Sequence, residues 1–289
     1  MSMGVGQADM GMKEAVTTIY RTVQDRDLTF LAAGFAYYAF VSLIPMILLA
    51  LVIGSLLGGE QVAERLILLA GDFMPEAGED LVTEALTTES GRAEATVVAL
   101  VVAAWGALKV FRGLSLAFDR VYGTVAEDSF VDQIMDGIAV IFAGAGALAL
   151  MIVMGTILGL VAGTIPFVGL LSWVVLLFGL VLVFLPVYYF LPPIDVTVRE
   201  ILPGAVFTAI GWTVLQAGFQ LYAANAGQYE AYGAVGAILL FVTWLYFAGI
   251  IILLGAVLNV VFSRPQIAVG ALDEGEGSAQ SYGESYPDS

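Results

Sequence analysis

The chain has 289 residues, of which 60% are hydrophobic and only 12% are charged, and its net charge is −16. Ordinary soluble domains are roughly 45 to 50% apolar and about 25% charged, so the composition indicates a membrane protein. The sequence contains no Cys and no His, which excludes disulfides, thiolate nucleophiles and the usual zinc ligands. The acidic excess disfavours nucleic acid as a partner. We expect no metal site and no cofactor.

Apolar segments long enough to cross a bilayer dominate the chain. A crossing helix needs roughly 20 residues, and the run 137–194, which has no charged residue, holds two of them. The sequence therefore predicts an all-α polytopic membrane protein, a six-transmembrane-helix bundle with amphipathic interfacial helices. The membrane domain is expected at 28–263, with spans at 28–57, 95–118, 137–163, 168–191, 201–223 and 233–262.

Three further segments flank or connect the spans. The N-terminal segment 1–27 has no signal-peptide pattern, and it contains an amphipathic helix whose apolar side carries Val16, Ile19, Tyr20 and Val23. The long loop 58–94 is acidic and is expected outside the cell as a solvated surface. The tail 264–289 is acidic and rich in Ser and Gly, so we expect it to be disordered and cytoplasmic.

The basic residues indicate the orientation. With six spans both termini lie on one side, and all ten Lys and Arg residues except Arg65 and Arg92 fall on that side. Because cytoplasmic loops carry an excess of basic residues, we expect both termini in the cytoplasm and the protein in the cell membrane. The water-facing parts are strongly acidic, as in proteins adapted to high salt, so we expect a halophilic, archaeal source.

Proline and glycine mark special positions within the spans. Pro45 and Pro186 have no N–H to donate and should kink the first and fourth spans. Gly155, Gly159 and Gly163 form a glycine ladder in the third span, and such spacing lets helix backbones approach closely. We favour packing inside the bundle for this ladder, with ligand binding and a homodimer contact as alternatives.

Polar side chains in or beside the spans are few. The candidates for binding a substrate or lipid headgroup are Tyr38 and Ser42 in the first span, Lys109, Arg112 and Asp119 near the end of the second, and Gln216 and Gln220 in the fifth. Lys109 and Arg112 share a helix face and lie deep, Lys109 roughly 13 Å from Phe118 by helix rise. They either hold an anionic headgroup or act as snorkelling anchors. The amides either line a cavity or join helices through hydrogen bonds.

Several ordered motifs resemble one family. The stretch 32–49, AAGFAYYAFVSLIPMILL, resembles the first helix of the YihY/BrkB family of six-span membrane proteins. The same family is matched by LAFDRVYG at 116–123, REILPGAVFTAIGW at 199–212, YGAVG at 232–236, WLY at 244–246 and LGAVLN at 254–259. One departure is Val257, where similar proteins usually have an acidic residue, so a role for that carboxylate is not carried over.

The resemblance implies a membrane protein whose relatives have been called ribonuclease BN, virulence factors and transporters, with lipid movement suggested for some. The sequence offers no catalytic constellation, so we expect no enzyme and regard the ribonuclease label as a misassignment. Our first hypothesis is a transporter that moves lipids or lipid-linked anionic molecules across the membrane. The alternative is a non-transporting structural or regulatory membrane protein. Membrane lipids and a second copy of the chain are the expected partners.

Overall fold

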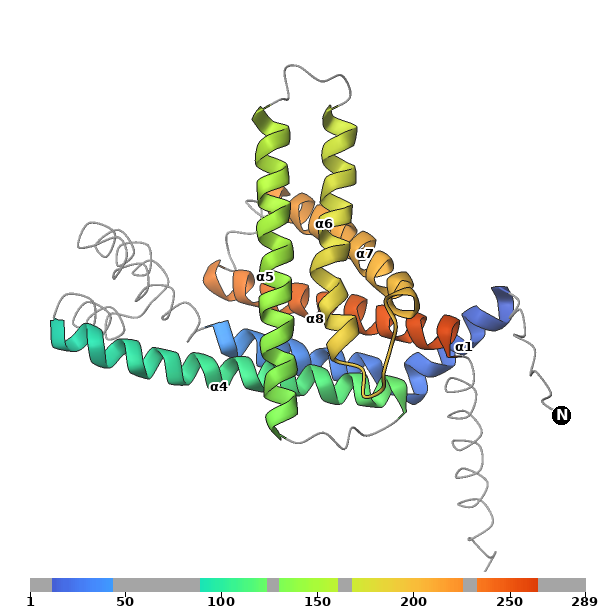
Figure 1. The fold of residues 1–289 in the computed structure, drawn as a ribbon, viewed down its shortest axis with the longest axis horizontal. Helices are drawn as coiled ribbons and strands as arrows, with labels where there is room; N and C mark the ends of the chain where they lie inside the picture. Colours follow the sequence, from blue (N-terminus) through green and yellow to red (C-terminus); the bar gives the residue numbers. More distant parts are fainter. Residues whose placement is uncertain (1–11, 44–88, 124–129, 161–167, 226–232, 265–289) are drawn as a thin grey trace, which may run out of the picture. The chain divides into compact units, whose positions relative to one another are not determined.

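The computed structural model describes residues 12–43, 89–123, 130–160, 168–225 and 233–264, and all regular structure among them is helical. The all-α prediction is confirmed for these residues. The described residues form the helices α1 (Met12–Asp25), an unlabelled helix (Leu28–Leu43), α4 (Glu89–Tyr122), α5 (Phe130–Leu160), α6 (Val168–Phe190), α7 (Val198–Asn225) and α8 (Gly233–Ser263). Figure 1 shows their arrangement within the chain.

Four of the described helices are long and apolar enough to cross a membrane, within Met135–Leu160, Gly169–Phe190, Val198–Tyr222 and Ile238–Ser263. The protein is therefore a polytopic membrane protein, and these segments agree closely with the last four expected spans. The first two expected spans correspond to Leu28–Leu43 and α4, and their crossing stays a prediction. Pro45, Gly163, loop residues 58–88 and tail residues 265–289 lie outside the described residues.

The chain divides into two compact units, each described by itself. One unit combines Met1–Gly34 with Leu114–Ser289, and the other is Phe35–Gly113. In the first unit α5 packs against α6, α6 against α7, α7 against α8, and α1 against α8. Figure 1 shows α5 and α6 side by side along most of their length.

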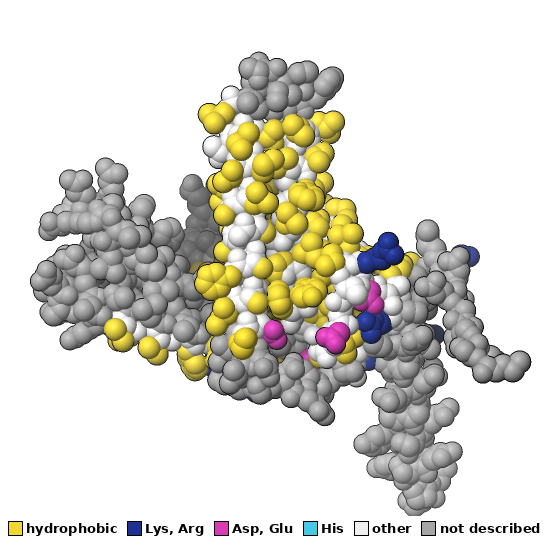
Figure 2. All heavy atoms as spheres, viewed as in Figure 1, with side chains coloured by type: hydrophobic (Ala, Val, Ile, Leu, Met, Phe, Trp, Pro, Cys, Tyr) yellow, Lys and Arg dark blue, Asp and Glu magenta, His cyan; other side chains and the backbone are white. Residues whose placement is uncertain are grey.

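The core of the first unit lies where α6, α7, α8 and the last turns of α4 meet. Its largest buried side chains include Phe118, Tyr122, Tyr188, Ile201 and Leu253. By contrast, large hydrophobic side chains along α5 are mostly exposed, and Figure 2 shows hydrophobic side chains covering the outward side of α5 and α6. That surface suits contact with lipid chains, which have the same polarity.

Local sequence fixes two helix ends that position the core. Before α7, the backbone N–H of Thr197 donates to Glu200 Oε2 at 2.7 Å, one half of a capping box. After α4, Gly123 adopts a positive φ of 71°, a conformation that favours glycine. Arg26 Nη1 donates to the Arg120 carbonyl there at 2.8 Å, so a cation caps the negative end of α4.

Candidate functional site

Polar side chains from three helices form a column along the contact between α7 and α8. We call Tyr188 of α6, Thr208 of α7, and Asn259 and Ser263 of α8 the polar column. Three of them are buried and Ser263 is half-buried. In hydrocarbon each polar group needs a partner within the protein, so this column decides how the helices can pack.

At one end of the column, α8 supplies partners for backbone groups of α7. Pro203 lies inside α7, where it has no N–H to donate and its ring crowds the carbonyl one turn earlier. Asn259 Oδ1 accepts the Gly204 N–H at 2.6 Å, and Ser263 Oγ donates to the Glu200 carbonyl at 3.0 Å. The two α8 side chains are one turn apart, as are the two backbone groups that they contact.

Farther along the column, Tyr188 joins all three helices. Its hydroxyl is hydrogen-bonded to Thr208 Oγ1 and donates to the Ile252 carbonyl of α8 at 2.8 Å. Tyr188 follows Pro186 within α6, and its ring is tilted against Phe118 near the end of α4. A single tyrosine thus connects α6 to the α7–α8 pair by hydrogen bonds.

Two glycines make this arrangement sterically possible. A Cβ added at Gly204 would meet the Gly255 carbonyl oxygen and the Asn259 amide. A Cβ added at Gly255 would meet Tyr188 Oη and Thr208 Oγ1. Any larger residue at either position must push the helices apart and break the column.

Asn259 has spare hydrogen-bonding capacity. Its side chain is only 2% exposed, and in the described part of the chain Nδ2 has no hydrogen-bond partner, although Oδ1 is paired. A buried amide nitrogen without a partner costs free energy and needs an acceptor such as water. It is the least satisfied group of the polar column.

Charged groups lie where α6 is joined to α7. Glu200 Oε1 pairs with Arg264 Nε at 3.1 Å, and Arg264 Nη2 donates to the Asp195 carbonyl at 2.9 Å. Burial raises the pKa of the nearby Tyr122 hydroxyl far above its usual range, while Arg264 lowers it and Glu200 raises it. Tyr122, beyond the expected end of its span, is therefore neutral.

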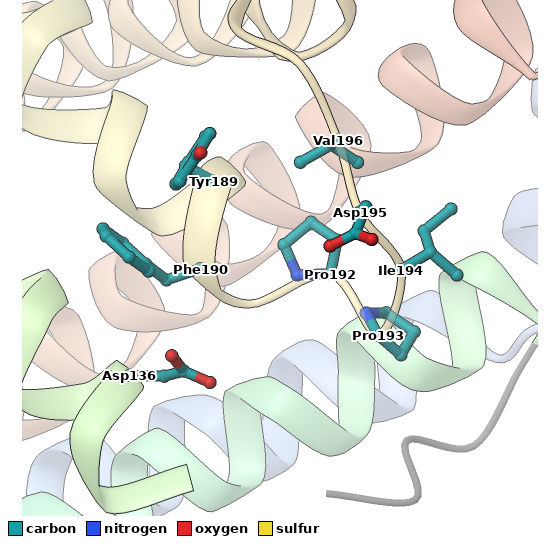
Figure 3. Close-up of a pocket in the computed structure, with 8 residues that line it drawn as sticks. All are labelled: Asp136, Tyr189, Phe190, Pro192, Pro193, Ile194, Asp195 and Val196. Carbon is teal, nitrogen blue, oxygen red and sulfur yellow. The ribbon is translucent and has the colours of Figure 1, made fainter. Parts of the chain in front are cut away.

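A hollow of about 510 Å³ opens beside the same linker, edged by Asp136 of α5, by Tyr189 and Phe190 of α6, and by Asp195 (Figure 3). Two carboxylate side chains at its edge repel anions. The hollow is therefore a poor receptor for the anionic headgroup expected from the sequence.

The glutamine candidates differ from each other. Gln216 Oε1 accepts a hydrogen bond from Trp244 Nε1 of α8 at 3.2 Å, which is the helix-joining role, and Trp212 and Trp244 stack edge to face beside it. Gln220, one turn farther along α7, is exposed, as is Gln216.

In the unit Phe35–Gly113, the basic candidates of α4 are exposed. Lys109 Nζ lies 3.7 Å from the centre of the Trp105 ring, a cation–π contact, and Arg112 is one turn farther along. The ring of Tyr38 lies against Gly113, the residue after Arg112, so three candidates are neighbours in this unit. Within the described residues, no carboxylate pairs with Lys109 or Arg112.

The remaining candidates have more ordinary surroundings. Ser42 is buried and donates to the Ala39 carbonyl of its own helix at 2.8 Å. Asp119 belongs to the other unit, is half-buried and has an interaction partner. Pro186 lies inside α6 as expected. No described atom lies within 4 Å of a Cβ added at Gly155 or Gly159, so their role in packing stays a prediction.

Sequence reasoning missed Tyr188 and Asn259 as members of one site. Tyr188 lies in a run of aromatic and aliphatic residues with no distinguishing period, and Asn259 is a single amide in the last span. The available signal was polarity inside an apolar helix, which marks Asn259 as needing a partner. Its partner is a backbone N–H next to a proline, which side-chain patterns do not show.

Comparison with known families agrees with the motifs found in the sequence. A family model described as virulence factor BrkB matches residues 19–279. The chain belongs to the BrkB family. One relative matches most of the chain. This UPF0761 membrane protein of Pseudoalteromonas translucida (strain TAC 125) is 28% identical over 86% of this chain and 85% of its own length.

Two relatives share shorter segments with this BrkB-family chain. The ribonuclease-like protein YfkH of Bacillus subtilis (strain 168) is 35% identical over 25% of the chain, and the match spans 27% of YfkH. A UPF0761 membrane protein of Nitrosospira multiformis is 36% identical over 25% of the chain and 17% of its own length. No solved structure matches the chain. The family resemblance predicted from the motifs is confirmed.

Proposed function

We propose that this BrkB-family protein moves lipids or lipid-linked anionic molecules across the membrane. The observation that carries the proposal is the pair Lys109 and Arg112 on α4. Both are exposed and one turn apart, on a helix that also exposes Val97, Val101 and Trp105. Cations beside apolar surface are costly in a membrane and need a counter-ion, and a lipid phosphate supplies one.

The aromatic contact of Lys109 supports a headgroup site. A cation–π contact is worth about 0.5 to 2 kcal/mol, depending on desolvation, and it leaves the positive charge unneutralised. Tyr38 beside Gly113 adds a hydroxyl-bearing ring to the same neighbourhood. A phosphate can accept hydrogen bonds from both cations, with Arg112 able to contact two oxygens at once.

The proposal includes an orientation and an absence of hydrolysis. With both termini in the cytoplasm, the end of α4 that carries Lys109 and Arg112 faces the cytoplasmic leaflet. The chain lacks His, the commonest general base, and its net charge of −16 repels nucleic acid. We therefore propose a non-enzymatic role, although the name of the relative YfkH speaks of a ribonuclease.

A specific observation favours the alternative, a structural or regulatory membrane protein. The polar column pairs its hydroxyl groups within the protein, and Gln216 is occupied by Trp244. These groups, buried in the polar column and exposed at Gln216, join helices and leave little for a substrate. The transport proposal therefore depends on α4 and not on α7.

The test is translocation of a fluorescent anionic lipid in reconstituted vesicles. We expect the wild type to translocate faster than empty vesicles, and Lys109→Gln with Arg112→Gln to slow the rate by up to about 30-fold, at about 1 kcal/mol per charge. The matched control is Arg199→Gln, an exposed arginine of α7, which should keep the wild-type rate. Wild-type rates equal to those of empty vesicles would favour the structural role.

A further inference from the structure

Helix α1 buries threonine side chains and exposes large apolar ones, the reverse of the usual amphipathic helix. Thr18 and Thr22 are 9% and 5% exposed, whereas Val16 and Tyr20 are 61% and 62% exposed. The Thr22 hydroxyl donates to the Thr18 carbonyl at 2.8 Å, so it is satisfied within its own helix. The hydroxyl side of α1 can therefore pack against the protein, and of the apolar side Val16 and Tyr20 face outward, whereas Ile19 and Val23 are half-buried.

The exposed side of α1 lies at the boundary of the membrane domain. α1 contacts α8, a candidate span, and Figure 1 shows it beside the C-terminal end of that helix. That end carries Arg264 and its partner Glu200, charged groups that mark where the span leaves the hydrocarbon. After α1 the chain turns at Asp27 and continues directly into the apolar helix Leu28–Leu43.

The cations of α1 flank its apolar side. Lys13 and Arg21 are exposed, and the segment 12–27, which includes Arg26, holds three of the ten basic residues together with three acidic ones, Glu14, Asp25 and Asp27. The acidic residues of the helix, at positions 14 and 25, fall opposite the apolar side in a 3.6-residue period. Low overall hydrophobicity, a one-sided apolar face and flanking cations are typical of a helix lying in a bilayer surface.

We propose that α1 is a binding surface for anionic lipid headgroups. Val16 and Tyr20 insert between the headgroups of the adjoining leaflet, and Lys13 and Arg21 contact the lipid phosphates. This surface is distinct from the Lys109 and Arg112 pair and requires no transport. Lipid binding at this surface would also affect the core of the first unit, because Arg26, just after α1, caps the last turn of α4.

The chain contains no Cys, so single labels can be placed in the full-length protein. Val16→Cys and Asp25→Cys would each carry an environment-sensitive fluorophore in vesicles containing nitroxide-labelled lipid. One set of vesicles is phosphatidylcholine alone and the other contains phosphatidylglycerol. We expect several-fold stronger quenching at Val16→Cys than at the exposed control Asp25→Cys, and stronger quenching with phosphatidylglycerol.

A second variant tests the charges. In the Val16→Cys background, Lys13→Gln with Arg21→Gln should remove the response to phosphatidylglycerol, lowering the ratio of bound to free helix about fivefold per charge. Equal quenching at both label positions would overturn the proposal. Quenching that rises with the number of protein copies per vesicle, but not with nitroxide lipid, would also overturn it, by identifying a second copy as the occupant.

Discussion

The α7–α8 pair and the α5–α6 pair are both made of membrane-length helices, but they pack in different ways. α7 is the least apolar of the four candidate spans, yet 28% of its most apolar stretch is buried, against 6% for α5. Lipid chains are as apolar as leucine, so apolarity alone does not bring helices together in a membrane. Polar contacts and close backbone approach do, and α7–α8 has both.

Glycine shows the same contrast. The glycine ladder of α5 matches the sequence pattern for close helix packing, but Gly155 and Gly159 meet nothing described within 4 Å. Gly204 and Gly255 have no glycine one turn away, yet each adjoins the polar column of the neighbouring helices. Close approach also occurs against apolar side chains, because a Cβ added at Gly179 of α6 would meet the Met151 side chain of α5, and one added at Gly211 would meet the Ile251 side chain.

The difference in packing between the two helix pairs is tested most directly at Gly255. Gly255→Ala places a methyl group against Tyr188 Oη and Thr208 Oγ1, and we expect it to destabilise the protein by about 1 to 3 kcal/mol. Gly159→Ala, where an added Cβ meets no described atom within 4 Å, should not destabilise the protein, because alanine favours a helix over glycine by up to about 1 kcal/mol. Unfolding in mixed micelles monitored by tryptophan fluorescence measures both. Equal losses would mean that α5 is packed as tightly as α8.

Tyr188→Phe measures how much one hydroxyl of the polar column contributes to stability. Loss of the bonds to Thr208 and the Ile252 carbonyl should cost about 0.6 to 1.7 kcal/mol, the range for hydrogen bonds between membrane helices. Tyr189→Phe is the matched control, because Tyr189 is exposed. A double-mutant cycle with Thr208→Val isolates the Tyr188–Thr208 term, and additive effects would show that the two hydroxyls are not coupled.

The smallest expected effect is at the far end of the α7–α8 contact. Gln216→Leu removes the bond from Trp244, whereas Gln220→Leu makes the same chemical change one turn away. The difference in unfolding free energy between the two variants should be about 0.5 kcal/mol. A difference near zero in the same micelle assay would limit the stabilising contact to the polar column.

The helices could be predicted from the sequence because bilayer thickness fixes their length. The expected span 168–191 corresponds to α6, Val168–Phe190, and 233–262 to α8, Gly233–Ser263. The pairing of faces could not be predicted, because nearly uniform apolar helices have no side that is distinguished by hydrophobicity. Asn259 accepts the N–H of Gly204, the residue after Pro203, and that contact depends on the tertiary arrangement.

The candidate site was predicted less completely. Lys109, Arg112 and Tyr38 stand out in sequence as polar groups among apolar ones, and the structure places Tyr38 next to the residue after Arg112. The apolar pattern of α1 did not indicate which side faces the protein, because threonines that bond to their own helix can be buried there. The halophilic source, the orientation and self-association stay predictions.

The contacts of Asn259 and Ser263 also have a consequence for biogenesis. The Gly204 N–H and the Glu200 carbonyl of α7 find these partners only at the end of α8, which a ribosome makes later. During synthesis α7 must therefore form without these two side-chain contacts until α8 has been made. The last turn of α8 therefore completes the helix before it, and the two helices should enter the bilayer as one unit.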